Sequence, residues 1–203
     1  MIEITRDGAL WTACLNRPDK ANAVTREMLA AVADFAESAQ GVAKVIVLTG
    51  AGKVFSAGMD LEAAKTGLPT DPVWERASGA IAAFEGLSIA ALNGTLAGGS
   101  MGMALACDLR VAVAGAKLFY PVMSLGFLPQ PSDPARLVRL VGPSRAKMIL
   151  MAGQKIPVEE AQGWGLIDRV VEKDALEPTV RELASAVLGA APSHIGGIKR
   201  LIA

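Results

Sequence analysis

The chain has 203 residues, is 52% hydrophobic, and carries 20 basic and 20 acidic side chains. Its length fits one domain, and its apolar content is enough to bury a substantial core. Because the basic side chains are scattered and the formal net charge is zero, a nucleic-acid surface and an anionic membrane partner are not expected. Charged residues follow the first methionine at once, unlike a secretory signal, so the sequence predicts a cytoplasmic protein.

The first predicted elements are a hairpin and a helix. Residues 2–6 and 9–15 are strand-like and flank Asp7-Gly8, a turn sequence that predicts a β-hairpin. Apolar side chains then recur at helical spacing in residues 25–40, and Thr25 is suited to cap this helix.

Three short apolar runs, rich in β-branched residues, are predicted buried strands at 44–49, 88–92 and 109–113. The second run belongs to an uncharged segment, residues 86–107, which is long enough to span a membrane. Its glycine pairs and its change from an extended to a helical pattern favour a buried strand, loop and helix instead. Residues 61–85 are interrupted by glycine and proline, and predict a flap followed by a helix at 73–84.

After Pro134 the pattern becomes helical. Helices are predicted at 135–141, 144–151, 158–164 and 178–188, with a last one from residue 193 and a short strand at 168–171. Strands that alternate with helices indicate α/β architecture. Cys14 and Cys107 each lie in an apolar run, and we expect buried free thiols rather than a disulfide.

Two glycine-containing segments carry the functional signal: Phe55-Ser56-Ala57-Gly58-Met59-Asp60 and Asn93-Gly94-Thr95-Leu96-Ala97-Gly98-Gly99-Ser100. Each places small residues where a predicted strand leads into a helix. Free backbone N–H groups at such a point can come close to a ligand. Two amides that converge on one carbonyl oxygen would form an oxyanion hole.

Together the two segments resemble the signature of the enoyl-CoA hydratase/isomerase (crotonase) superfamily. Further landmarks of the family follow along nearly the whole chain: Leu15-Asn16-Arg17-Pro18, Asn22-Ala23, Ala106-Cys107-Asp108, Leu125 to Pro129, Glu160-Ala161 and Trp164 to Ile167. The resemblance implies a crotonase-like spiral of ββα units in a single domain of residues 1–203. Residues 1–133 would form the spiral core, and residues 134–203 a helical C-terminal region shorter than in most relatives.

The resemblance also implies the site. The backbone N–H groups of Met59 and Gly99 would polarise the carbonyl of a CoA thioester, which is the substrate, and no separate cofactor is expected. Residues expected to line the bound CoA are Arg17, Lys20, Ala21, Ala57, Met59, Asp60, Leu61 and Glu62. Asp60 has an alternative role as a helix N-cap, and Arg17 and Lys20 have one as solvated side chains.

The usual acid and base are missing. Hydratases of the family place glutamates at two positions that fall here on Gly102 and Val122, and neither residue can transfer a proton. The aspartate of dienoyl isomerases and of a dehalogenase branch aligns with Gln130. Hydration holds a water between an acid and a base, so we expect isomerase- or hydrolase-type chemistry rather than hydration.

Candidates to replace the missing groups lie near the expected acyl pocket: Tyr120, Ser124, Gln130, Ser132 and Asp133. Asp133 is the only carboxylate among them, but a place just before Pro134 also suits it as the N-cap of a helix. Asp71 and Glu75 lie on the flap, where they would either swing towards the site or be solvated.

Two other functions stay open. A catalytically silent acyl-CoA-binding paralogue would keep the oxyanion hole and lose the acid and base. A serine hydrolase is suggested by Gly98-Gly99-Ser100-Met101-Gly102, which matches G-x-S-x-G, followed by Asp168 and His194 in the hydrolase order. His194, the only histidine, would otherwise be an exposed residue at the start of a helix.

One histidine and two distant cysteines do not suit a zinc site, so we expect no metal. Relatives assemble as trimers or pairs of trimers, and the resemblance therefore implies a homotrimer or hexamer. It also places Lys199 near a CoA phosphate, although a lysine at a helix C-terminus equally suits the helix dipole.

Overall fold

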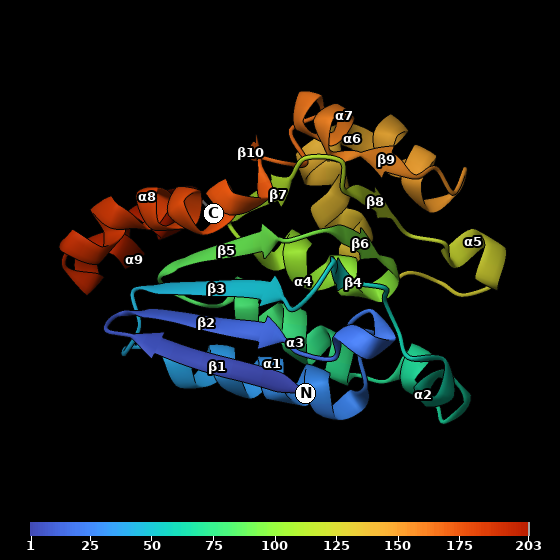
Figure 1. Ribbon diagram of the computed structural model, residues 1–203, viewed down its shortest axis with the longest axis horizontal. Helices are drawn as coiled ribbons and strands as arrows, with labels where there is room; N and C mark the ends of the chain where they lie inside the picture. Colours follow the sequence, from blue (N-terminus) through green and yellow to red (C-terminus); the bar gives the residue numbers. More distant parts are fainter. Residues whose placement is uncertain (203) are drawn as a thin grey trace.

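A six-stranded sheet forms the centre of the computed structural model, which describes residues 1–202 (Figure 1). Its strands, in spatial order, are β1 (Ile2–Asp7), β2 (Leu10–Leu15), β3 (Val45–Gly50), β5 (Leu87–Leu92), β7 (Leu109–Val113) and β10 (Arg169–Val171). The hairpin of β1 and β2 is antiparallel, and every other pair in this sheet is parallel. The predicted hairpin and strands are thus confirmed, and the α/β spiral is the observed fold.

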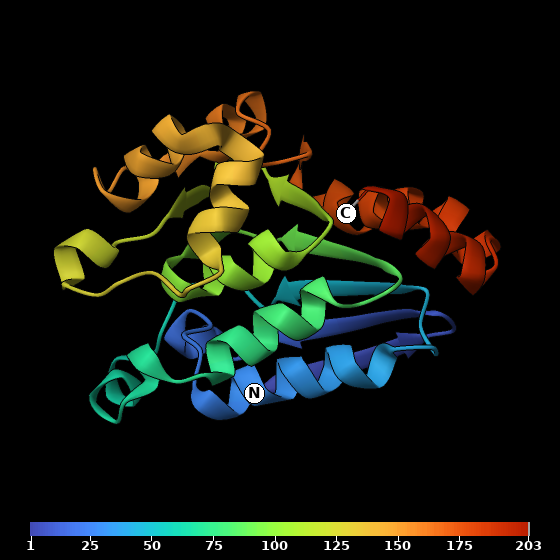
Figure 2. The ribbon, with the colours of Figure 1, turned by 180° about the vertical axis from the view of Figure 1, so that it is seen from behind.

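Helices cover this sheet. Those of the N-terminal part are α1 (Arg26–Ala39), α2 (Leu61–Lys65), α3 (Val73–Ala82) and α4 (Met101–Ala106), with 3-10 turns at Pro18–Lys20 (η1), Leu68–Thr70 (η2) and Gly98–Ser100 (η3). Helices α1 and α3 contact each other and lie behind the strands in Figure 1, and in front of them in Figure 2. Thr25 caps α1 as predicted, because its side chain accepts a hydrogen bond from the Met28 N–H.

A second, four-stranded sheet was not predicted. Its strands are β4 (Val54–Ser56), β6 (Thr95–Ala97), β8 (Lys117–Phe119) and β9 (Ile156–Pro157). Strands of two or three residues are too short to show a period. β4 and β6 are parallel neighbours, so the segments after their carboxyl ends, 57–60 and 98–100, meet at one edge of the sheet.

The C-terminal region is mainly helical and contributes β9 and β10 to the two sheets. Its helices are α5 (Val122–Leu125), α6 (Asp133–Leu150), α7 (Val158–Gly163), α8 (Leu176–Gly189) and α9 (Pro192–Ile202), with a 3-10 turn at Lys173–Ala175 (η4). α6 is kinked where Gly142 has a φ of +77° and Pro143 follows, which agrees with the two predicted helices on either side. α8 contacts β3, β5 and β7.

Both cysteines are free, as predicted, and Cys107 is buried while Cys14 is half-buried. Over residues 1–202, every helix is too short or too polar to cross a membrane. The uncharged segment 86–107 forms β5, β6, η3 and α4, as its glycine pattern predicted.

Candidate active site

The two glycine segments are in direct backbone contact. A Cβ atom built on Gly58 would lie 3.0 Å from the Ala97 carbonyl oxygen, and one built on Gly98 would lie 3.4 Å from the Gly58 Cα. Both glycines have positive φ, +98° and +59°, a region that L side chains rarely adopt. The chain therefore uses glycine at both positions to bring the two loops together.

Two serines hold these loops in place. The hydroxyl groups of Ser56 and Ser100 lie 2.7 Å apart, and both residues are fully buried. Ser56 donates its hydrogen to the Asn22 carbonyl and accepts a hydrogen bond from the Gly58 N–H. Since Ser56 has only one hydrogen, Ser100 must be the donor between the two serines. Ser100 is therefore a structural link between the loops.

The backbone N–H groups of Met59 and Gly99 have no acceptor among residues 1–202. On either side of Met59 the backbone is paired with Val24: the Val24 N–H donates to the Gly58 carbonyl, and the Asp60 N–H donates to the Val24 carbonyl. In this parallel bridge the Met59 N–H points to the opposite side. Two unpaired donors are thus available where the loops meet.

The indole ring of Trp74, on α3, covers Gly99 on its Cα side. A Cβ atom at residue 99 would lie 2.9 Å from the ring. The ring is itself fixed, because its Nε1 donates to the Leu68 carbonyl at 2.9 Å and the side chain is buried. The sequence analysis did not identify Trp74, whose apolar spacing on α3 indicates only a core residue.

Several residues predicted to bind CoA lie together beside Met59. Arg17 donates from Nη1 to Asp60 Oδ2 at 2.6 Å and to the Ala23 carbonyl at 3.0 Å, and the Ala57 N–H donates to the Ala21 carbonyl. Arg17 is half-buried in this ion pair and is not a freely solvated side chain.

Asp60 is also the N-cap of α2, as the alternative interpretation had it, since its Oδ1 accepts from the N–H groups of Glu62 and Ala63. The hydrogen bond from Arg17, followed by these backbone bonds, holds the pKa of Asp60 below its ordinary value. Lys20, Leu61 and Glu62 are exposed, and Glu62 pairs with Lys65.

Asp133 does not cap α6, so the N-cap interpretation is wrong. No side-chain cap bond is present at this helix start, and the carboxyl group of Asp133 is buried, with the residue 1% exposed. It lies against α4: a Cβ atom on Gly102 would be 2.5 Å from its Oδ1 and 2.9 Å from its Oδ2. The room left by Gly102 and a hydrogen bond from Tyr120 Oη to Oδ2, at 3.0 Å, hold the carboxyl group inside the protein.

Burial raises the pKa of Asp133 to about 7. The Tyr120 hydrogen bond and the Arg136 charge act in the opposite direction, and the Glu75 charge adds to the rise. Arg136 Nη1 is 3.9 Å from Oδ1, beyond hydrogen-bond distance. Burial, and then the charge of Asp133, raise the pKa of the Tyr120 hydroxyl as well.

The other polar candidates are engaged with the flap. Gln130 donates from Nε2 to the Pro69 carbonyl at 3.0 Å, and Glu75 accepts hydrogen bonds from both the backbone N–H and the hydroxyl of Ser132. Asp71 is buried, pairs with Arg26 and accepts from the Val73 N–H, so the prediction of solvated flap carboxylates is wrong. Together these contacts tie the flap to the loop before α6.

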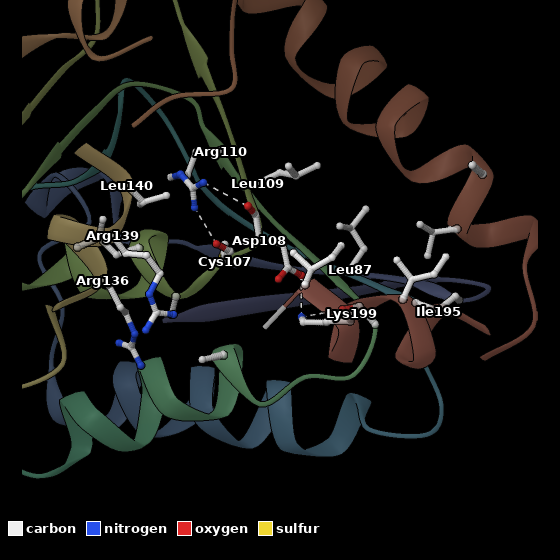
Figure 3. Close-up of a pocket in the computed structure, with 18 of the residues that line it drawn as sticks. Leu87, Cys107, Asp108, Leu109, Arg110, Arg136, Arg139, Leu140, Ile195 and Lys199 are labelled. Atoms are coloured by element: carbon white, nitrogen blue, oxygen red, sulfur yellow. Dashed lines mark hydrogen bonds and ion pairs between the residues drawn. The ribbon is translucent and has the colours of Figure 1, made fainter. Parts of the chain in front are cut away.

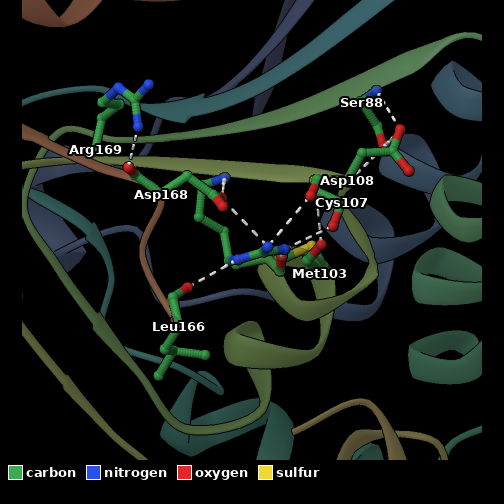
Figure 4. A network of polar contacts seen from close by, with 9 residues as sticks. Ser88, Met103, Cys107, Asp108, Leu166, Asp168 and Arg169 are labelled. Atoms are coloured by element: carbon green, nitrogen blue, oxygen red, sulfur yellow. Dashed lines mark hydrogen bonds and ion pairs between the residues drawn. The ribbon is translucent and has the colours of Figure 1, made fainter. Parts of the chain in front are cut away.

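The structure does not assemble the serine-hydrolase triad. Ser100 is linked to Ser56, whereas Asp168 accepts from the Arg110 backbone N–H at 2.7 Å and pairs with its guanidinium (Figure 4). His194 is exposed near the start of α9, as its alternative interpretation predicted.

His194 lines a separate cavity of about 810 Å³, with walls from α4, α6 and α9 among others. Lys199 lies there too and donates to Asp108 Oδ2 at 2.7 Å and to the Gly86 carbonyl (Figure 3). Its ammonium therefore pairs with Asp108, rather than serving the end of its own helix. The loops around Met59 and Gly99 are not among the residues that line this cavity.

Val122, at the second hydratase position, starts α5 and is buried, so this position is apolar as well as uncharged. Across residues 1–202 no group of three histidine, cysteine or acidic side chains is arranged to hold a metal ion.

Comparison with known proteins shows the family of this chain. The statistical description of the enoyl-CoA hydratase/isomerase family matches residues 5–202. The chain belongs to this family. Its relatives include the carnitinyl-CoA dehydratases of Citrobacter koseri, 35% identical over 98% of this chain and 79% of the relative, and of Escherichia coli strain K12, 34% identical with the same coverage.

Solved structures of the family share the fold. DspI from Pseudomonas aeruginosa superposes with a TM-score of 0.91 at 31% identity, covering 99% of this chain and 85% of that one. An enoyl-CoA hydratase/isomerase from Pseudoalteromonas atlantica T6c gives a TM-score of 0.91 at 30% identity, with 99% and 82% covered. The family and these relatives identify an enzyme of the enoyl-CoA hydratase/isomerase type.

Proposed function

We propose that this enzyme binds a CoA thioester and moves a proton on its acyl chain, with migration of a double bond as the favoured reaction. The observation that carries this proposal is the pair of unpaired N–H groups at Met59 and Gly99, on two loops in backbone contact. A thioester oxygen that accepted both would be polarised, and the enolate formed from it would be stabilised by about 3 kcal/mol for each donor.

The rest of the CoA would follow the first loop. Ala57, Asp60, Leu61 and Glu62 would line the pantetheine arm, and Arg17, Lys20 and Ala21 would lie near the nucleotide. Supporting this path are the Arg17–Asp60 ion pair and the Ala57–Ala21 hydrogen bond, which hold these segments beside Met59. The reaction needs no cofactor other than the thioester itself.

The choice of reaction follows from the side chains around the two donors. Gly102 and Val122 offer no pair of carboxylates to hold a water, which disfavours hydration. Buried Ser100, linked to Ser56, disfavours hydrolysis through a serine nucleophile. Isomerisation of a 3-enoyl thioester moves only one proton and needs no water.

A second candidate, removal of water from a hydroxyacyl-CoA, is favoured by the 35% identity to a carnitinyl-CoA dehydratase. Both reactions use the same two N–H groups, because each begins with polarisation of the thioester carbonyl.

Binding of matched ligands tests the two N–H groups without a mutation. A CoA thioester should bind more tightly than the thioether in which the carbonyl is replaced by a methylene. Two hydrogen bonds of about 0.5–1.5 kcal/mol each correspond to roughly a 5- to 150-fold difference in Kd by isothermal titration calorimetry. Equal affinities would refute the role of Met59 and Gly99.

The reaction is identified by mass spectrometry and chromatography after incubation with saturated, 2-enoyl, 3-enoyl and 3-hydroxyacyl thioesters. Unchanged mass with a shifted double bond is the expected result. Gain of water by an enoyl thioester and its loss from the hydroxyacyl thioester are the two directions of one reaction, so either would select the second candidate and overturn the argument from Gly102 and Val122. Free CoA would indicate a hydrolase. Tight binding with no turnover would identify a silent paralogue.

A further inference from the structure

The carboxyl group of Asp133 occupies the space where a side chain at residue 102 would begin. Its two oxygens are the closest atoms to the Cβ position of Gly102, at 2.5 and 2.9 Å. The family resemblance places a hydratase glutamate at residue 102, whereas here the carboxyl group of Asp133, from α6, fills the space of the missing Cβ atom. Given the function proposed above, on which this inference rests, we propose that Asp133 is the residue that takes up and returns the proton.

Gly99 and Gly102 lie close together in one helical stretch, and their Cα sides meet different neighbours, Trp74 and Asp133. η3 and α4 are continuous, and Gly102 follows Gly99 by three residues. Residues at this spacing are about one helical turn, roughly 5 Å, apart. A thioester whose oxygen met the Gly99 N–H would therefore lie within about one helical turn of the Gly102 position that Asp133 faces.

One oxygen of this carboxyl group, Oδ1, has no hydrogen-bond partner among the described residues. Oδ2 accepts the hydrogen bond from Tyr120 Oη, whereas Oδ1 is buried and receives no hydrogen bond from residues 1–202. The nearest cationic atom, Arg136 Nη1, is 3.9 Å away and is itself buried without an acceptor in that part of the chain. An unsatisfied buried carboxylate oxygen is costly, and a catalytic role is one of the reasons for which proteins keep such an atom.

The step balances within the substrate and this one side chain. Oδ1 takes a proton from C2 of a 3-enoyl thioester, so the C2–H bond breaks and an O–H bond forms. The electron pair moves to the thioester oxygen, between the Met59 and Gly99 N–H groups. The O–H bond then breaks as the proton is delivered to C4, and the double bond ends between C2 and C3.

The groups that face Asp133 suit this exchange. Tyr120 precedes α5, Arg136 lies on α6 and Glu75 on α3, while α4, which contributes Gly102, has no titratable side chain. In these surroundings the pKa of Asp133 is raised to about 7, close to neutral pH, where a group that must both accept and release a proton works best. Tyr120 is a positioning residue, because it holds Oδ2 and turns Oδ1 towards α4.

Hydrogen exchange at C2 of a saturated acyl-CoA measures removal of the C2 proton separately from double-bond migration. A saturated acyl-CoA is incubated in D₂O with the wild type, Asp133→Asn, or Asp174→Asn, a matched change of an exposed aspartate. We expect Asp133→Asn to bind the thioester within about twofold of the wild type and to lose roughly 100-fold or more of the exchange rate. Asp174→Asn should match the wild type.

Two more readouts separate proton transfer from a structural role. The wild-type exchange rate should rise through pH 7 as Asp133 ionises, and Tyr120→Phe should move this midpoint while the variant stays folded. Gly102→Ala should also slow exchange, because its new methyl group would displace the carboxyl group without removing it.

If folded Asp133→Asn still binds the thioester more tightly than the thioether and exchanges hydrogen at the wild-type rate, Asp133 does not transfer the proton. The proposed function would then still stand. A wild type that shows no such preference would overturn the proposed function, and this inference with it.

Discussion

The buried Asp133 carboxyl group predicts a specific dependence of stability on pH. Its pKa in the folded protein is about 7, compared with an ordinary value of 3.8. Below about pH 4 the group is protonated in both the folded and the unfolded chain and contributes no difference. Between pH 4 and 7 the unfolded chain releases the proton while the folded protein keeps it, so the free energy of unfolding falls as pH rises. Above pH 7 both forms are ionised and the loss is complete.

The structure sets the size of this loss. At about 1.4 kcal/mol per pKa unit, the gap between 3.8 and about 7 corresponds to a ceiling of about 4 kcal/mol. Asp133→Asn removes the titration while keeping an acceptor for the Tyr120 hydroxyl. The variant should therefore gain stability relative to the wild type as pH rises from 4 to 8, by up to about this amount.

Urea unfolding of both proteins at intervals between pH 4 and 8 measures the difference, and the contributions of other titrating groups cancel at each pH. Asp174→Asn, at an exposed site, is the control and should follow the wild type throughout. If the difference between Asp133→Asn and the wild type stays flat over this range, the carboxyl group is not held in its protonated form by burial. The geometry at Gly102 would then need another explanation.

Two further substitutions test the site's framework. Ser100→Ala removes the hydrogen donated to Ser56, so urea unfolding should show a loss of about 1 kcal/mol of stability. The variant should keep measurable turnover. Complete loss of turnover in a folded variant would instead indicate that Ser100 is a nucleophile. Asp60→Ala removes the N-cap of α2 and the partner of Arg17, so we expect a loss of about 1 kcal/mol of stability and weaker binding of a CoA thioester. Unchanged affinity by calorimetry would count against the proposed CoA path.

Most of the central sheet could be predicted from the sequence because its inner strands β3, β5 and β7 are largely buried on both faces. Val45 to Leu48 form an uninterrupted apolar run, and the Asp7-Gly8 turn between strand-like segments is a local signal. The second sheet could not be predicted in this way. Its strands have two or three residues, and they form because β4 and β6 are brought together by the larger sheet and its helices.

Among the side chains of the site, too, some roles follow from the local sequence and others depend on distant contacts. The sequence predicts the Asp60 cap, and the structure confirms it, since capping depends on the residues that directly follow Asp60. Asp133 has an equally suitable position before Pro134, yet it turns inward. That outcome depends on Gly102 and Tyr120, which are distant in sequence and act only after α4 and α6 have packed together. Local preference therefore predicted a cap that Asp133 does not form in the packed structure.

A single unpaired oxygen would also limit which reactions the proposed site can perform. Asp133 Oδ2 is held by Tyr120 and Val122 leaves the other hydratase position apolar, so in the proposed mechanism Oδ1 alone would transfer the proton. An oxygen fixed on one side of an enolate can remove a proton from C2 and return it to C4 on that same side. It cannot at the same time take a proton from water and protonate carbon, as hydration with two carboxylates requires. In the mechanism proposed above, a carboxyl group at residue 133 in place of one at residue 102 would keep proton transfer in the site and favour isomerisation over hydration.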